Sequence, residues 1–218
     1  MTIGRATLYL GDCLALREQL PKADVLVSDP PYGIGYVHSG HGQGARPKTK
    51  AIAGDDQPFD PTPWLQAAPR VLLWGADHFR ARLPHGGRFL CWDKSVGVGQ
   101  HDSFTDAEYA WTNVPTIKRN VFRHLWKGFV RAKSSLDHAQ AGTHHVSQKP
   151  VALMRWCIEL LRCPADGVVL DPYMGSGTTG VAALSLGKRF VGVEIDAEHF
   201  EAACERMRRA CAELGLPE

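Results

Sequence analysis

The chain has 218 residues, 44% of them hydrophobic and 22% charged, and a net charge of +2 when its histidines are neutral. This composition excludes a disordered chain, and the length suits one α/β domain, residues 1–218, around a single core. The longest apolar runs fall far short of the roughly 20 residues that span a bilayer. Residues 1–5 also carry no apolar leader, so we expect a cytoplasmic protein without a membrane partner.

Cysteine and histidine spacing gives no sign of a metal. The six cysteines form no C-x-x-C pair, and the ten histidines lack cysteine or carboxylate ligands at the spacing of a metal site. We therefore expect reduced cysteines, structural or solvated histidines, and no bound metal.

Strand-like and helix-like segments alternate along the chain. Strands are predicted at residues 6–10, 24–28, 70–74, 87–92, 109–114, 168–171 and 190–194, and helices at residues 14–20, 77–83, 150–161, 178–186 and 197–214. Residues 25–27 and 168–170 are continuously apolar, as in strands that helices cover on both faces. The sequence therefore predicts a doubly wound, mostly parallel α/β sheet.

Two stretches stand outside this alternation. Residues 33–63 are rich in Gly, Pro and His and have no periodicity, which predicts a flexible loop at the active site; its first half holds Arg46 and Lys48 and no acid. Residues 113–149 carry seven Lys or Arg side chains against one acid, with aromatic residues between them. This insert is either a solvated hairpin whose aromatic residues belong to the core, or a surface that binds the phosphates of a nucleic acid.

A glycine-rich turn follows the strand at residues 168–171. Gly175, Gly177 and Gly180 form a G-x-G-x-x-G pattern that opens a helix, and Glu194 ends the next strand. Such a turn lets the backbone approach a ligand closely, and an acid in that place can accept both hydroxyls of a ribose. The alternative is a turn needed only for packing the helix on the sheet.

A nucleoside cofactor of this kind is NAD or S-adenosylmethionine. The stretch after Gly180 has room for one strand and one helix, whereas a dinucleotide site draws on a second βαβ half. The turn also begins with Asp171, a carboxylate that attracts the ammonium of a methionine moiety and repels a pyrophosphate. Both points favour S-adenosylmethionine.

The strand at residues 24–28 ends in Asp29-Pro30-Pro31-Tyr32, at the carboxyl edge where ligands of such sheets bind. One interpretation is a rigid turn, because two prolines fix φ and Asp favours turns. The other is chemical. The amino nitrogen of adenine or cytosine is a poor nucleophile, and the Asp29 carboxylate with the Pro30 carbonyl can each accept one N–H and so aim the lone pair at a methyl group. Tyr32 can stack on a base extruded from the duplex.

These motifs together resemble the DNA amino-methyltransferase family, which makes N6-methyladenine or N4-methylcytosine. Asp29-Pro-Pro-Tyr32 resembles its catalytic motif and Asp171-Pro-Tyr-Met-Gly-Ser-Gly177 its cofactor loop, while Gln148-Lys149-Pro150, Gly11-Asp12 and Val191-Gly-Val-Glu194 resemble flanking segments. The order of the motifs, with the insert at residues 112–146 between them, is that of the circularly permuted β group. The resemblance implies a Rossmann-like fold.

The resemblance also implies roles for individual residues. The catalytic residues would be Asp29, Pro30, Pro31 and Tyr32. The residues that bind S-adenosylmethionine, with S-adenosylhomocysteine as product, would be Asp12, Cys13, Lys149, Asp171, Pro172, Tyr173, Gly175, Ser176, Gly177, Thr178, Glu194 and Ile195. Double-stranded DNA would contact Arg46, Lys48, Lys118, Arg119, Arg123, Lys127, Arg131 and Lys133.

The short insert leads us to expect a short target sequence and a second subunit, since homodimers are frequent in the resembled group. Asp at position 29 resembles the adenine branch of the family. We therefore expect an enzyme that methylates the N6 amino group of adenine in DNA by direct transfer. The alternatives are N4-cytosine methylation, an RNA or protein methyltransferase, and a nucleic-acid-binding module without activity.

Overall fold

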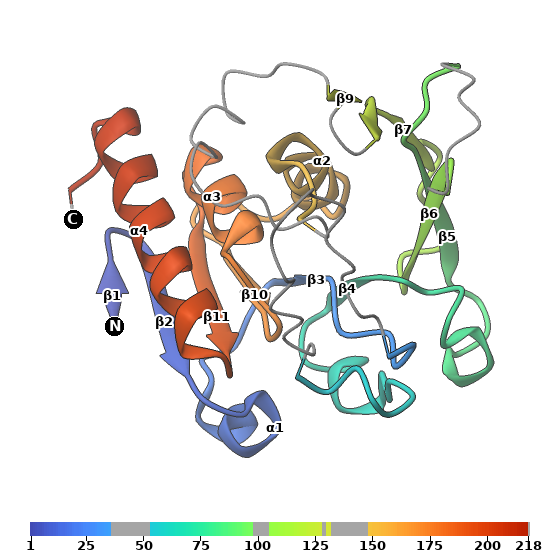
Figure 1. The fold of residues 1–218 in the computed structure, drawn as a ribbon, viewed down its shortest axis with the longest axis horizontal. Helices are drawn as coiled ribbons and strands as arrows, with labels where there is room; N and C mark the ends of the chain where they lie inside the picture. The colour runs from blue at the N-terminus through green and yellow to red at the C-terminus, as the bar shows by residue number, and fades with distance from the viewer. Residues whose placement is uncertain (36–52, 98–104, 128–129, 132–147, 218) are drawn as a thin grey trace, which may run out of the picture.

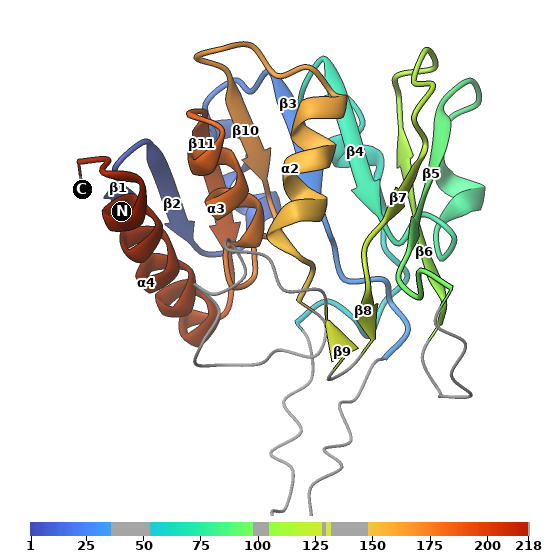
Figure 2. The same ribbon diagram turned by 90° about the horizontal axis from the view of Figure 1, so that it is seen from above.

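A computed structural model of the chain describes residues 1–35, 53–97, 105–127, 130–131 and 148–217. Most of its strands form one nine-stranded sheet, in the order β1-β2-β11-β10-β3-β4-β6-β5-β7 (Figure 2). The strands are β1 (Thr2–Ile3), β2 (Ala6–Leu10), β3 (Val25–Ser28), β4 (Arg70–Trp74), β5 (Arg88–Asp93), β6 (Ala107–Thr112), β7 (Val121–Arg123), β10 (Val168–Asp171) and β11 (Arg189–Glu194). A separate hairpin pairs β8 (Trp126–Lys127) with β9 (Val130–Arg131).

The central strands are parallel. β2, β11, β10, β3 and β4 run in one direction, while β6 is antiparallel to both of its neighbours, β4 and β5. Every residue of β3 and β10 is buried, as their continuously apolar sequences require. The predicted mostly parallel α/β sheet is therefore confirmed.

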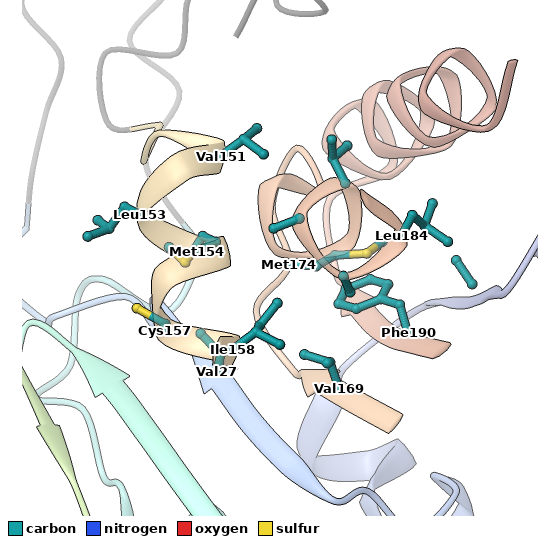
Figure 3. Packing of buried hydrophobic residues seen from close by; sticks show 14 of the residues in the cluster. Val27, Val151, Leu153, Met154, Cys157, Ile158, Val169, Met174, Leu184 and Phe190 are labelled. Carbon is teal, nitrogen blue, oxygen red and sulfur yellow. The ribbon is translucent and has the colours of Figure 1, made fainter. Parts of the chain in front are cut away.

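Three helices cover one face of the sheet: α2 (Val151–Leu160), α3 (Thr178–Ser185) and α4 (Ala197–Leu214) (Figure 1). Ile158 of α2 lies with Val27 of β3 and Val169 of β10 in the core between the helices and the sheet (Figure 3). These three side chains are fully buried. Alternate strand residues point to the other face, as the period of two in a strand dictates.

Short elements cover the second face. They are α1 (Cys13–Leu16) and the 3-10 turns η1 (Arg17–Gln19), η2 (Thr62–Trp64) and η3 (Arg80–Arg82). Leu26 of β3 packs in a second cluster that includes Trp64 and Phe79. Large aromatic side chains on short turns thus bury the face that long helices leave open.

Most predicted elements occur, but one predicted helix is absent and the bounds of others differ. The helix predicted at residues 77–83 is wrong, because that stretch forms turns with i to i+3 hydrogen bonds, such as Leu83 N to Arg80 O at 3.2 Å, and only Arg80–Arg82 is helical. Leu83 precedes Pro84 and is extended, with ψ of 141°, because the residue before a proline is disfavoured in the α region, so an α-helix cannot run to the predicted end. The helix predicted at residues 14–20 divides into α1 and η1, and β6 begins at Ala107, two residues before the prediction. Within the described residues, no helix is both long and apolar enough to span a membrane.

Candidate active site

The two turns that the sequence singles out lie side by side. β3 and β10 are neighbouring parallel strands, so the turn that begins at Asp29 and the turn that follows Asp171 leave the same edge of the sheet. A hydrogen bond of 2.6 Å joins the strand ends, from Ser28 Oγ to Asp171 Oδ1. The two motifs therefore lie next to each other at one carboxyl edge of the sheet.

Asp29 accepts a hydrogen bond on each carboxylate oxygen. The Tyr32 hydroxyl donates to Oδ1 at 2.5 Å, and Lys149 Nζ donates to Oδ2 at 2.7 Å and to the Tyr32 oxygen at 3.1 Å. Burial raises the pKa of Asp29, and the charge of Lys149 opposes that rise. The Asp29 side chain stays 26% exposed, whereas that of Lys149 is 6% exposed. The Asp29 side chain is thus held by protein donors and is still partly exposed.

The ring of Tyr32 fits against Gly75 and His78. Gly75 follows β4 with φ of +73°, and a Cβ added there would overlap the Tyr32 ring. His78 stacks on Tyr32 with ring centroids 4.9 Å apart and an angle of 14° between the planes. Neither neighbour was predicted, because their importance arises only when β4 lies beside β3.

Lys149 begins a row of charged side chains, of which the two lysines are buried and Glu108 is partly exposed. Its Nζ lies 2.9 Å from Glu108 Oε2, and Lys94 Nζ donates to Glu108 Oε1 at 2.9 Å. Burial alone would raise the pKa of Glu108, but the two ammonium groups outweigh burial and lower it to about 2. Burial alone would lower the pKa of Lys149, and Asp29 with Glu108 instead raise it well above its usual value. Lys149 was predicted at the cofactor, and the contacts that the structure gives its ammonium are with Asp29, Tyr32 and Glu108.

The glycine turn is braced by two carboxylates. Glu194 ends β11 and accepts from Gly175 N at 2.9 Å and from Asp196 N at 2.7 Å. Asp171 is 2% exposed and accepts from Tyr173 N at 3.1 Å as well as from Ser28. Burial raises the pKa of Asp171 to about 6, although hydrogen bonds from Ser28 and Thr179 oppose the rise.

The glycines of the turn differ in what surrounds them. Gly177 has φ of +81° and its added Cβ would lie 2.9 Å from Met207 of α4, and Gly180 is blocked by Met207 and Phe190. These two glycines serve the packing of α3, which was the alternative to a ligand role. Gly175 has φ of +52°, and among the described residues nothing lies within 4 Å of an added Cβ, so its backbone faces a space that these residues leave open.

The other predicted cofactor residues gather at the ends of β2, β10 and β11. Asp12 caps α1 by accepting from Leu14 N at 2.8 Å, and Gly11 N donates to Glu194 O at 2.8 Å. Cys13 is buried, which raises the pKa of its thiol to about 11. The Tyr173 hydroxyl accepts from Trp64 Nε1 at 3.1 Å, Pro172 is buried and Ile195 is 55% exposed. The structure brings these residues together, and their roles stay predictions.

Arg206 of α4 joins the glycine turn to the start of α2, and sequence reasoning missed it. Its Nη1 donates to Ser176 O at 2.7 Å, to Ser176 Oγ at 2.9 Å and to Thr178 Oγ1 at 3.1 Å. With its amide oxygen turned toward Arg206, Gln148 accepts from Nη2 at 3.0 Å. The residue next to Gln148 is Lys149, so one of these neighbouring side chains contacts Arg206 and the other contacts Asp29.

The predicted DNA contacts divide into three groups. Lys118 and Arg119 are exposed, and Arg123 is exposed with its Nε 3.8 Å from Asp93. The backbones of Lys127 and Arg131 lie in the β8-β9 hairpin. Arg46, Lys48 and Lys133 lie outside the described residues.

Where the structure describes them, the aromatic residues of the insert pack in or against the core, as one of the two interpretations of this segment predicts. Trp126 is 7% exposed and donates to Gln148 O at 3.2 Å. Phe122 packs on Trp156 of α2 with ring centroids 5.3 Å apart. We therefore expect any nucleic-acid contact of this segment to come from its charges.

Asp55 holds the two ends of the stretch that follows Tyr32. Its Oδ1 accepts from Gly33 N at 2.8 Å and from Ile34 N at 3.3 Å, and its carbonyl oxygen accepts from Gly35 N at 2.8 Å. Asp55 is 4% exposed. The loop predicted at residues 33–63 is thus anchored at the edge of the sheet, and residues 36–52 lie outside the described part. Among the described side chains, no cluster of three or more His, Cys, Asp or Glu residues forms a metal site.

Sequence comparisons match the chain with DNA methyltransferases. A model of the DNA methylase family, which spans N6 and N4 methyltransferases, matches residues 92–205. The type II methyltransferase M.ScaI of Streptomyces caespitosus is 24% identical over 263 aligned residues, covering 95% of this chain and 83% of that protein.

Solved structures share the fold. The structure of the M1.HpyAVI complex with SAM matches with a TM-score of 0.59 at 22% identity, covering 93% of this chain and 98% of the other. PvuII DNA methyltransferase, which is cytosine-N4-specific, matches with a TM-score of 0.57 at 15% identity, covering 94% and 87%.

Proposed function

The chain belongs to the DNA methylase family of N6 and N4 methyltransferases, and from that premise we propose that it transfers a methyl group from S-adenosylmethionine to the N6 amino group of adenine in double-stranded DNA. The observation that carries this proposal is the adjacency of Asp29 and the glycine turn on neighbouring parallel strands. A methyl donor held by one turn would face an amino group held by the other. Adenine is preferred to cytosine because Asp at position 29 resembles the adenine branch.

The proposed cofactor site lies at the ends of β2, β10 and β11. The open space over Gly175 fits a ligand that approaches the backbone, since no atom of the described residues lies within 4 Å of the place where a Cβ would stand. Around it, Asp12 and Glu194 offer carboxylates for an adenine amino group and a ribose, and Ile195 offers an exposed apolar surface. Asp171, Pro172 and the residues from Tyr173 to Thr178, with Cys13 beside them, complete the proposed site. When bound, S-adenosylmethionine supplies an electrophilic methyl group on a sulfonium.

Asp29 and Pro30 are the proposed acceptors for the target amino group. A carboxylate oxygen has two acceptor positions, so Asp29 can accept an amino N–H while Lys149 and Tyr32 remain bonded to it. The Pro30 carbonyl oxygen would accept the second N–H. Holding both hydrogens localises the nitrogen lone pair, and the two prolines keep the acceptors in place. As the N–CH3 bond forms and the S–CH3 bond breaks, S-adenosylhomocysteine would leave as the thioether, and the methylated nitrogen would then lose one proton to water.

Tyr32 is the proposed platform for the extruded base. Its ring is fixed by the stack on His78, and the base would use the opposite face. Stacking of a base on an aromatic side chain contributes about 1–3 kcal/mol. The same stack would serve cytosine, so it does not select the base.

DNA binding is proposed for the basic residues of the insert at residues 112–146 and of the loop at residues 33–63. Lys118, Arg119 and Arg123 offer exposed charges, and Lys127, Arg131, Lys133, Arg46 and Lys48 are proposed to add to them. The short insert supports a homodimer in which a second subunit completes the DNA contact. The motif order, with Asp29 ahead of the glycine turn, supports membership of the permuted β group.

The test is transfer of a labelled methyl group from S-adenosylmethionine to unmethylated duplex DNA, followed by nucleoside analysis. We expect N6-methyldeoxyadenosine with the wild-type protein and loss of transfer with Asp29→Ala and Asp29→Asn. Asp166→Ala is the matched control, because Asp166 is an exposed acid that precedes β10 at the opposite edge of the sheet. Methyl transfer that survives both Asp29 substitutions would contradict the proposal. If the product is N4-methyldeoxycytidine, the target base is cytosine and not adenine.

A further inference from the structure

A row of alternating charges runs from Asp29 across the carboxyl edge of the sheet. Asp29 follows β3, Glu108 lies near the start of β6, and Lys94 follows β5. Because β6 is antiparallel to β4 and β5, its first residues share the edge where those strands end. Lys149, just ahead of α2, completes the row with contacts of 2.7 Å to Asp29 and 2.9 Å to Glu108.

Tryptophan side chains line this row. Lys149 Nζ lies 5.9 Å from the centroid of Trp74, and Lys94 Nζ lies 5.7 Å from that of Trp92. The two indoles pack edge to face, with centroids 6.3 Å apart. Both are fully buried, so the ammonium groups are held by carboxylates and aromatic faces with little water. Charges in such surroundings act strongly on one another.

The arrangement divides the Lys149 ammonium between two carboxylates. A Lys149 paired with Asp29 alone would hold that carboxylate in a tight ion pair and weaken it as an acceptor for a third donor. Glu108 draws the ammonium from the other side, and Lys94 keeps Glu108 ionised. We propose that Glu108, supported by Lys94, is a positioning residue that sets how strongly Lys149 engages Asp29 and so keeps Asp29 able to accept the target amino group.

This inference rests on the proposed function, but it makes a prediction about Asp29 that needs no substrate. The charged and titratable groups that face Asp29 in the described part of the chain are Lys149, Glu108, Tyr32 and Asp171. Glu108→Gln removes a negative charge and leaves Lys149 to Asp29 alone, and both effects favour the ionised form of Asp29. Lys149→Met removes the cation and favours the protonated form. The two substitutions therefore shift the titration of Asp29 in opposite directions.

The first measurement is carbon-13 NMR titration of the Asp29 carboxyl in the protein without DNA, with its signal assigned by Asp29→Asn. We expect Glu108→Gln to move the titration to lower pH and Lys149→Met to move it to higher pH. Glu213→Gln, which removes an exposed carboxylate of α4, should leave it in place. If Glu108→Gln does not fold, the double variant Glu108→Gln/Lys94→Met removes one charge of each sign and carries the same expectation. An unchanged or raised Asp29 titration in these variants would overturn the inference.

The second measurement is the pH profile of kcat for methyl transfer. Glu108→Gln should lower the plateau by about tenfold, which corresponds to about 1.4 kcal/mol, the order of one hydrogen bond. It should also move the acid limb to lower pH, while KM for S-adenosylmethionine stays unchanged. A structural role would lower kcat without moving the limb, and that result would also count against the inference. Absence of transfer by the wild type would defeat the proposed function alone, because the NMR titration would still decide the role of Glu108.

Discussion

Ser28 donates a hydrogen bond of 2.6 Å to Asp171, and these two residues end the neighbouring strands β3 and β10. The bond ties the Asp29 turn to the glycine turn at their common origin. Ser28→Ala should lower the free energy of unfolding by about 1–3 kcal/mol, since it removes one partner of a buried carboxylate. Urea unfolding measures this loss. Ser185→Ala removes a serine hydroxyl that bonds only within α3, at Ala182 O, and an equal loss there would contradict the expectation.

Gly175 and Gly187 form a matched pair for testing the glycine turn. Both have positive φ, and in the described part of the chain no atom lies within 4 Å of an added Cβ at either position. Alanine at either position should lower the free energy of unfolding by about 1–2 kcal/mol through backbone strain. Only Gly175→Ala should weaken binding of S-adenosylmethionine, because only Gly175 lies at the proposed cofactor site. Calorimetric titration of both variants measures the difference, and equal affinities would argue against that site.

Asp171 should make stability depend on pH. Its pKa of about 6 in the folded protein lies above the ordinary aspartate value of 3.8, so the folded state binds the proton more tightly than the unfolded state. The resulting stabilisation is present below about pH 4 and is lost as the pH rises through 6, a change of about 3 kcal/mol. Asp171→Asn should therefore gain stability relative to the wild type between pH 4 and pH 7.

The measurement for Asp171 is urea unfolding of both proteins across that pH range. Asp166→Asn is the control, because the hydrogen bond from Arg5 lowers the pKa of the exposed Asp166, so the stability difference of this variant should vary little between pH 4 and pH 7. Stability differences for Asp171→Asn that do not vary with pH would show that burial does not raise the pKa of Asp171.

Arg206→Ala should reduce affinity for S-adenosylmethionine by about tenfold or more. Hydrogen bonds to a charged group contribute about 1.5–3 kcal/mol, and Arg206 holds Ser176 and Thr178 in the glycine turn. Arg208→Ala is the control on the same helix, since the contact of Arg208 is with the sulfur of Met1. Fluorescence or calorimetric titration compares the two, and an unaltered affinity in Arg206→Ala would mean that the turn keeps its shape without this arginine.

Lys118 and Arg119 test the proposed DNA surface. Replacing both with alanine should weaken DNA binding for all sequences and reduce the slope of log K against log[salt] by about 1.8, at about 0.9 per phosphate contact. The control is Lys22→Ala/Lys188→Ala, which removes two cations that precede β3 and β11 at the other edge of the sheet. If the salt dependence of DNA binding changes equally in both double variants, the change reflects net charge alone and contradicts a DNA surface at Lys118 and Arg119.

Long elements with clear end signals could be predicted from the sequence. Residues 197–214 form α4 as predicted, because Asp196 caps the first turn and Gly215 ends the helix in the left-handed conformation. The strands β7, β8 and β9 have two or three residues each and were not predicted. Strands so short are stabilised by their partners, and a partner such as β5 for β7 comes from a distant part of the sequence.

The candidate site was predictable where its residues follow a strand end in a recognisable motif, as Asp29 does. Glu108 was left just outside the predicted strand at residues 109–114, and a single acid there gave no signal. Its position beside Lys149 depends on the antiparallel pairing of β6 with β4. Arg206 was likewise hidden on a helix, since only the packing of α3 against α4 brings it to Ser176. Such partners follow from tertiary structure, which local patterns do not contain.

The anchoring of Gly33 and Ile34 to Asp55 has a consequence for the evolution of this chain. Both ends of the intervening stretch are fastened beside Tyr32, so the number of residues between them can change without moving the Asp29 turn. Each doubling of a loop costs only about 0.6 kcal/mol in closure entropy. Insertions and deletions can accumulate between these two fixed points, and relatives can acquire new contacts there while inheriting the same chemistry.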